Sequence, residues 1–145
     1  MWELRHGLIE RYDLDIPWDT PIGEGYDRVR HRKAFLRFLH FVNGSLGGSS
    51  VHGVEPIWAT QDNLLRGFSE FVAPDHVLRE TQINEGLAVL AMEVGIEPPP
   101  LGDAIPDEPF PLAAIYDDEV EKAVRDAYAR DYMAFGFKKW DRDGR

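Results

Sequence analysis

Apolar residues recur at helical spacing along much of the chain. The clearest example is residues 120–128, where apolar side chains follow at i, i+3, i+4, i+7 and i+8 and form one stripe of a helix. Asp117 or Asp118 can accept hydrogen bonds from the first free backbone N–H groups, and Asp118 with Glu121 has the spacing of a capping box. Gly136 can adopt the left-handed backbone conformation that ends a helix. The pattern therefore predicts a closing helix with its own start and end signals.

Similar patterns predict four helices upstream of the closing helix. They cover residues 1–12, 27–42, 60–68 and 85–94, with Asp27, Thr60 and Asn84 as candidate N-caps and Gly95 as the end of the last one. His76–Thr81 is the best strand candidate. Residues 43–50 are rich in glycine and serine and are expected to form a connector. Residues 97–111 contain six prolines in fifteen positions, which predicts an extended or polyproline-like path.

These elements predict a mainly α fold with one or two short strands, which is too few for a doubly wound sheet. We expect a single domain over residues 1–145. Its parts are an N-terminal helix and loop (1–26), a helical core with a short strand (27–96), a proline-rich extended segment (97–116) and a C-terminal helix (117–137).

Composition narrows the class of protein. Hydrophobic residues make up 43% of the chain, which is ordinary for a globular domain. The absence of cysteine excludes disulfides, thiolate nucleophiles and cysteine-based zinc sites. No apolar run approaches the roughly 18 residues of a membrane helix, so we expect a cytoplasmic protein that does not enter a membrane. The net charge of −10 argues against a nucleic-acid partner.

Basic residues gather in the second predicted helix. Arg30, Lys33, Arg37 and His40 fall within an arc of about 80° when positions advance by 100° per residue. One interpretation is a cationic surface for phosphate or sulfate. The other, and the commoner outcome for such helices, is a solvated face without a ligand.

Other candidate sites are weaker. His52 could act as a general base for a hydroxyl group, although a lone histidine usually has no such role. Residues 43–50 lack the Lys and Thr of a phosphate-binding loop, so a mobile loop is expected there. The five histidines show no i, i+3 or i, i+4 pairing, and we expect no metal site.

The string Tyr128–Phe137 reads Tyr-x-x-Asp-aromatic-x-x-Phe-Gly-aromatic and resembles the C-terminal helix of bacterial sulfotransferases. Three upstream segments extend the resemblance over residues 30–137. Phe35–Leu39 is similar to the family's Phe-x-x-Phe-Leu helix, and Trp58–Leu65 to its His-Trp-x-Pro-Gln-x-x-x-Leu segment, with Ile57 and Thr60 at the His and Pro positions. Val77–Arg79 with Ile83 and Leu87 is similar to its Leu-Arg-x-Glu-x-Leu element, with Thr81 at the Glu position.

The resemblance implies transfer of a sulfuryl group from PAPS to a hydroxyl or amine acceptor, such as a carbohydrate. Gln61 and Arg79 match family positions that hold the acceptor-side loop and the sheet edge; the alternative is a structural role for each, as a cap partner or in a buried hydrogen bond. The chain has no Gly-x-x-x-x-Gly-Lys-Ser/Thr loop for the donor, so we expect it to be the C-terminal portion of such a protein and inactive alone. The candidate anion- and substrate-binding residues are Arg30, Lys33, Arg37, His52 and Gln61. The acceptor and the catalytic base are not identified.

Two alternatives stay open. One is a non-catalytic helical module that kept the family's helices and forms homo-oligomers through apolar surface left by the missing sheet. The other is a small helical binding protein whose resemblance to sulfotransferases is coincidental.

Overall fold

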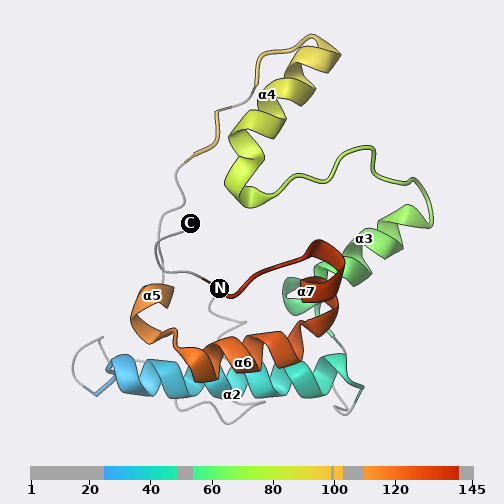
Figure 1. Cartoon of the computed structure of the whole chain (residues 1–145). Helices are drawn as coiled ribbons and strands as arrows, with labels where there is room; N and C mark the ends of the chain where they lie inside the picture. The colour runs from blue at the N-terminus through green and yellow to red at the C-terminus, as the bar shows by residue number, and fades with distance from the viewer. Residues whose placement is uncertain (1–24, 49–53, 99, 103–109, 141–145) are drawn as a thin grey trace. The chain divides into compact units, whose positions relative to one another are not determined.

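The regular elements of the described residues are all helices (Figure 1). The computed structural model describes residues 25–48, 54–98, 100–102 and 110–140. In chain order the elements are α2 (Arg28–Leu46), the 3-10 turn η1 (Pro56–Trp58), α3 (Gln61–Ser69), the 3-10 turn η2 (Glu80–Gln82), α4 (Ile83–Val94), α5 (Leu112–Ile115), α6 (Asp118–Ala127) and α7 (Ala129–Phe135). The mainly α prediction is confirmed for these residues. The helix expected at residues 1–12 lies outside them.

The strand predicted at His76–Thr81 is wrong. Residues 76–79 have no regular structure, and Glu80–Gln82 form the turn η2. A strand needs a neighbour that pairs with its backbone N–H and C=O groups. The described part of the chain contains no second strand that could supply this pairing.

Helix α2 begins as predicted and ends later than predicted. The carboxylate of Asp27 accepts a hydrogen bond from the backbone N–H of Arg30 at 2.8 Å, which makes Asp27 the N-cap. The helix continues through Leu46, so residues 43–46 are helical and not part of a connector. Leu46 packs against the cluster of Val42 and Trp58. This tertiary contact outweighs the weak helix propensity of the Asn-Gly-Ser sequence.

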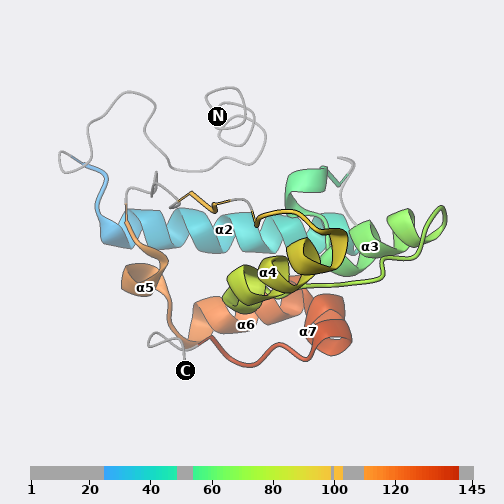
Figure 2. The same cartoon turned by 90° about the horizontal axis from the view of Figure 1, so that it is seen from above.

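The chain divides into two compact units, Met1–Arg66 with Glu108–Arg145, and Gly67–Asp107. In the first unit, α2 and α6 lie side by side and run parallel (Figures 1 and 2). Their contact forms two apolar clusters. One contains Leu36, Leu39, Val120 and Ala123, and the other contains Val42, Trp58 and Ala127. The apolar stripe predicted for residues 120–128 is therefore confirmed as the face that packs on α2.

The closing helix is interrupted once. Tyr128 has φ −109° and ψ 31°, which separates α6 from α7. Asp117, and not Asp118, is the N-cap, because its Oδ1 accepts from the N–H groups of Glu119 and Val120 at 3.1 and 3.0 Å. The capping box predicted for Asp118 and Glu121 is wrong, since both side chains bond other partners. Gly136 ends α7 with φ 63°, as predicted.

The second unit is built around α4. The helix begins at Ile83, so the predicted cap Asn84 lies inside it, and Gln82 at the N-cap position makes no side-chain capping bond. Gly95 ends the helix with φ 71°, as predicted. Leu78 packs so closely on Gly86 that a Cβ there would lie 2.5 Å from a Leu78 methyl carbon. Ala91 is the buried residue of α4, and apolar side chains such as Met92 and Val94 are exposed.

Candidate functional site: an aromatic groove

The first unit contains a groove of about 740 Å³ whose walls are mostly apolar and include eight aromatic side chains. We call it the aromatic groove. Its lining residues are Phe35, Phe38, Leu39, Pro56, Ile57, Trp58, Ala59, Gln61, Leu64, Leu112, Tyr116, Val124, Tyr128, Asp131, Tyr132, Phe137, Lys138 and Trp140. A concave, largely apolar site of this size with a few polar groups is typical of a small-molecule pocket.

Helix α2 supplies one wall of the groove. Phe35, Phe38 and Leu39 follow at i, i+3 and i+4, so they share one face of the helix. The sequence pattern predicted this face as apolar, and the structure confirms it. The basic residues of the same helix do not line the groove.

The turn η1 places Trp58 at the centre of an aromatic cluster. The indole stands nearly perpendicular to the rings of Phe38 and Phe41, at centroid distances of 6.0 and 6.1 Å. Such edge-to-face contacts add stability beyond the buried area. The hydroxyl of Tyr128 donates to the backbone carbonyl of Trp58 at 3.2 Å. Trp58 is 5% exposed, and its Nε1 has no acceptor among the described residues.

Asp131 joins α7 to the start of α3. Its Oδ2 accepts from the backbone N–H of Gln61 at 2.9 Å, and its Oδ1 accepts from the backbone N–H of Asp62 at 2.9 Å. Thr60 completes the cap, because its hydroxyl accepts from the N–H of Asn63 at 3.2 Å, as the sequence predicted. The first N–H groups of α3 are therefore all bonded, and the buried carboxylate lies at the positive end of the helix.

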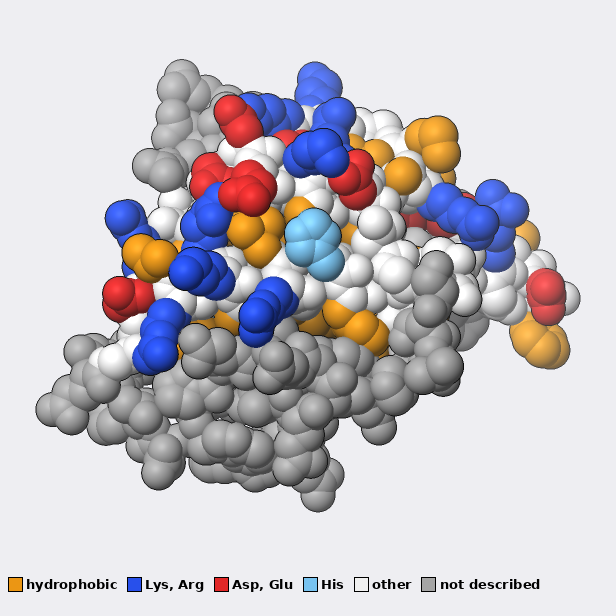
Figure 3. All heavy atoms as spheres, turned by 90° about the horizontal axis from the view of Figure 1, so that it is seen from below, with side chains coloured by type: hydrophobic (Ala, Val, Ile, Leu, Met, Phe, Trp, Pro, Cys, Tyr) orange, Lys and Arg blue, Asp and Glu red, His pale blue; other side chains and the backbone are white. Residues whose placement is uncertain are grey.

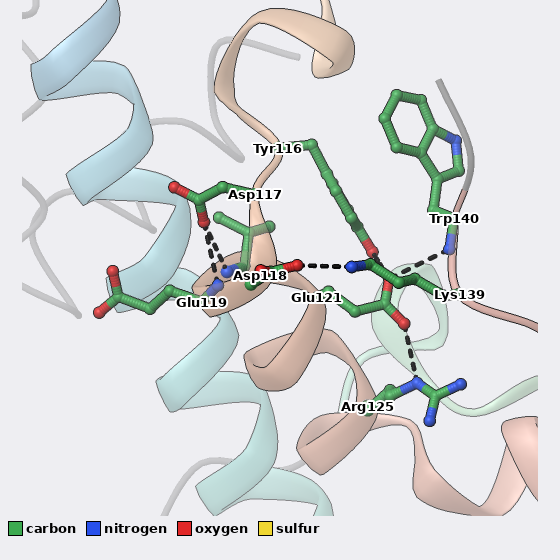
Figure 4. A network of polar contacts seen from close by, with 9 residues as sticks. Tyr116, Asp117, Asp118, Glu119, Glu121, Arg125, Lys139 and Trp140 are labelled. Carbon is green, nitrogen blue, oxygen red and sulfur yellow. Dashed lines mark hydrogen bonds and ion pairs between the residues drawn. The ribbon is translucent and has the colours of Figure 1, made fainter. Parts of the chain in front are cut away.

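A second buried carboxylate, Glu121, holds the segment that carries Trp140 beside the groove (Figure 4). It accepts hydrogen bonds from the Tyr116 hydroxyl at 2.5 Å, the Trp140 backbone N–H at 3.2 Å and Arg125 Nε at 2.8 Å. Burial alone would raise the pKa of Glu121, but these three bonds outweigh it and keep the pKa below its ordinary value. The rings of Tyr116 and Trp140, both in the groove wall, lie 4.7 Å apart.

The hydroxyl groups of the groove tyrosines stay protonated near neutral pH. Burial is the main reason that the pKa values of Tyr116, Tyr128 and Tyr132 lie above the ordinary phenol value. None of the three is poised to act as a base near neutral pH.

The structure divides the predicted site residues between two places. Gln61 lines the aromatic groove. Arg30, Lys33 and Arg37 are exposed on α2 and do not line it. Arg30 donates to the backbone carbonyl of Gly25. His52 lies outside the described residues.

The basic face of α2 also carries acidic neighbours. Figure 3 shows Lys and Arg side chains gathered on one face with Asp and Glu side chains among them. Arg32 pairs with Asp117 at 2.7 Å and with Glu119 at 2.5 Å, which ties the start of α2 to the start of α6. The cationic character predicted for this helix is thus partly neutralised.

Sequence reasoning missed Asp131, Glu121 and Trp140 as organising residues. Asp131 appeared in the family-like string, but its partners are 69 and 70 positions away. Glu121 looked like a capping residue because of its spacing. No local pattern indicates that the backbone N–H of Trp140 donates to Glu121 of α6.

Comparisons of the chain with protein-family models, with curated proteins and with solved structures returned no match. Within the described ranges, no group of three or more histidine, aspartate and glutamate side chains is arranged to hold a metal ion. No helix among the described residues has the length and apolar character needed to span a membrane.

Proposed function

We propose that this chain is the helical, acceptor-side part of a sulfotransferase-like protein that moves a sulfuryl group from PAPS to a hydroxyl or amine acceptor. The observation that carries the proposal is the bond between Asp131 and the N–H groups of Gln61 and Asp62. It joins the segment that carries the most specific resemblance, Tyr128–Phe137, to one of the weaker matches, Trp58–Leu65.

The third segment of the resemblance in this unit meets the other two. Phe35, Phe38 and Leu39 form the groove wall that faces Trp58 and Tyr128. Three segments matched separately in the sequence thus build one concave surface. In this proposal, the shared surface is the acceptor side of the site.

In this proposal the groove side orients the acceptor and the α2 cations face the donor. Arg30, Lys33 and Arg37 are chemically suited to phosphate and sulfuryl oxygens. The sequence lacks a phosphate-binding loop, so these exposed side chains would hold PAPS weakly, and the isolated chain is expected to show no turnover.

The test is calorimetric titration of the chain with 3′-phosphoadenosine 5′-phosphate, the desulfated donor. Saturable binding is expected, with a salt-dependent affinity that falls when Lys33 and Arg37 are both changed to Gln. Arg66→Gln, which removes an exposed cation paired with Asp62, is the matched control and should change nothing. Absence of saturable binding in the folded wild-type chain would refute the donor-binding part of the proposal.

A second candidate is a non-catalytic helical interaction module, and the aromatic groove itself favours it. An apolar concave surface left uncovered is a common site of self-association. Sedimentation velocity separates the two candidates: a dimer or larger species that fails to bind the desulfated donor supports the module, and a monomer that binds the donor supports the sulfotransferase-like part.

A further inference from the structure

The aromatic groove contains hydrogen-bond donors that the protein does not use. The indole Nε1 of Trp58 is buried without an acceptor among the described residues. The side-chain amide of Gln61 and the ammonium group of Lys138 likewise bond no other residue in the described part of the chain. A buried N–H without an acceptor is unfavourable, so an acceptor atom supplied by a ligand would stabilise the groove.

The other polar groups of the groove already have partners. Both carboxylate oxygens of Asp131 accept backbone N–H groups. The hydroxyl of Tyr128 donates to the Trp58 carbonyl, and that of Tyr116 donates to Glu121. Besides the Gln61 amide, which can both donate and accept, a ligand therefore meets the unused donors of Trp58 and Lys138, and these favour a molecule that carries acceptor atoms.

The groove lining carries one negative and one positive side chain, and the two differ in their surroundings. Asp131 and Lys138 are the charged residues among the described ones that line it. The Asp131 carboxylate is compensated by two N–H groups and by the positive end of α3. Lys138 is exposed and has no such compensation. Although the chain has a net charge of −10, the local distribution decides which ion a site attracts.

The walls select flat molecules. Trp58 and Tyr132 and their aromatic neighbours offer ring faces and edges, which pair with other rings in stacked or edge-to-face geometry. The volume of about 740 Å³ is in the range of small-molecule sites.

We propose that the aromatic groove binds a flat aromatic molecule with one carboxylate or similar oxyanion. The rings lie between the aromatic walls, and the oxyanion accepts from the unused donors, with Lys138 as its cation. The site stands on the groove's own geometry and does not depend on sulfuryl transfer, so either idea can fail without the other.

Three ligands with the same ring system test the charge preference: 2-naphthoate, the neutral 2-naphthamide and the cationic 2-naphthylmethylamine. Titration of the whole ¹⁵N-labelled chain is followed through the indole N–H resonance of Trp58. We expect 2-naphthoate to bind with a Kd below about 1 mM, about tenfold more tightly than the amide, and to shift this resonance. The amine is expected to bind more weakly than both.

Substitutions test the role of Lys138. Lys138→Met should weaken 2-naphthoate about tenfold and leave 2-naphthamide unchanged, whereas Lys138→Arg should keep the preference for the anion. Lys122→Met removes an exposed cation of α6 that does not line the groove and should change neither affinity. Circular dichroism checks that each variant is folded.

Three results would each overturn the proposal: equal affinities of the anion and the amide, a Lys138→Met variant with unchanged preference, or saturation that leaves the Trp58 resonance in place. Failure of the folded chain to bind 2-naphthoate at about 5 mM would also overturn it. None of these results bears on binding of the desulfated donor.

Discussion

The carboxylate of Asp131 accepts hydrogen bonds from the backbone N–H of Gln61 across 70 positions of sequence, at 2.9 Å. This bond, with its counterpart to Asp62, makes a side chain of α7 the N-terminal cap of α3. The cap sits in the wall of the aromatic groove. The shape of the groove therefore depends on a residue whose role is not visible in its own helix.

Asp131→Ala should destabilise the first unit by about 2–3 kcal/mol, because it leaves two N–H groups at the partly buried start of α3 without acceptors. Asp131→Asn keeps one good acceptor and should cost about 1–2 kcal/mol. Urea unfolding followed by circular dichroism measures both. Asp126→Asn, which breaks an exposed i, i+4 pair with Lys122, is the control and should cost no more than about 0.5 kcal/mol. Equal effects of the Asp131→Ala and Asp126→Asn variants would contradict the capping role.

Glu121 should make the stability of the protein depend on acid pH. The pKa of Glu121 in the folded protein lies below the ordinary value of 4.5. Its contribution to the free energy of unfolding is therefore complete above pH 4.5 and is lost as the pH falls through the folded pKa. Glu121→Gln should cost about 1–2 kcal/mol at pH 7 and flatten the stability profile below pH 4.5. Urea midpoints from pH 7 to pH 3 measure the profile. A variant profile as steep as that of the wild type would show that other carboxylates carry the acid sensitivity.

The contact between Arg32 and Asp117 combines an ion pair with a helix cap. The Arg32 guanidinium holds the pKa of Asp117 below its ordinary value. Asp117→Ala removes both functions and should cost about 1–2 kcal/mol, whereas Asp117→Ser keeps a capping oxygen and should cost about 0.5 kcal/mol. A double-mutant cycle with Arg32→Met isolates the pair. Because the pair is partly exposed, the coupling free energy between Arg32 and Asp117 should be smaller in about 1 M salt. A coupling free energy that does not change with salt would contradict an ion pair.

Two glycines should respond in opposite directions to the same substitution. Gly136 has φ 63° at the end of α7, so Gly136→Ala should destabilise by about 1 kcal/mol through backbone strain. Gly67 lies within α3, and a Cβ there would meet no heavy atom within 4 Å. Gly67→Ala should therefore stabilise α3 by about 0.5–1 kcal/mol. Thermal unfolding of both variants checks the signs, and a stabilising Gly136→Ala would exclude a left-handed stop in solution.

The sequence predicted what depends on local spacing. The α6 stripe, the Asp27 and Thr60 caps and the two glycine stops were all visible because their partners lie within a few residues. Asp131 and Glu121 were not, because their partners are chosen by the packing of α7 and of the chain end. The strand at residues 76–81 failed for a related reason, since β-propensity has no effect without a neighbouring strand.

The apolar face of α2, which forms one wall of the groove, was predicted from the sequence. Gln61, predicted as a substrate-binding residue, lies in the groove lining, whereas the predicted basic residues Arg30, Lys33 and Arg37 do not. The groove forms where aromatic residues from separate segments of the chain come into contact, and local patterns in one sequence do not predict such long-range contacts.

The pairing of α2 with α6 has a consequence for synthesis of the chain. Arg32 bonds Asp117, which lies 85 positions further along the sequence. The apolar side of α2 therefore leaves the ribosome long before α6 has been synthesised. Closing so long a loop carries an entropic penalty and slows folding relative to a helical hairpin of the same size. Nascent chains that stop short of α6 would present Leu36, Leu39 and Val42 to solvent and become substrates for chaperones and proteases.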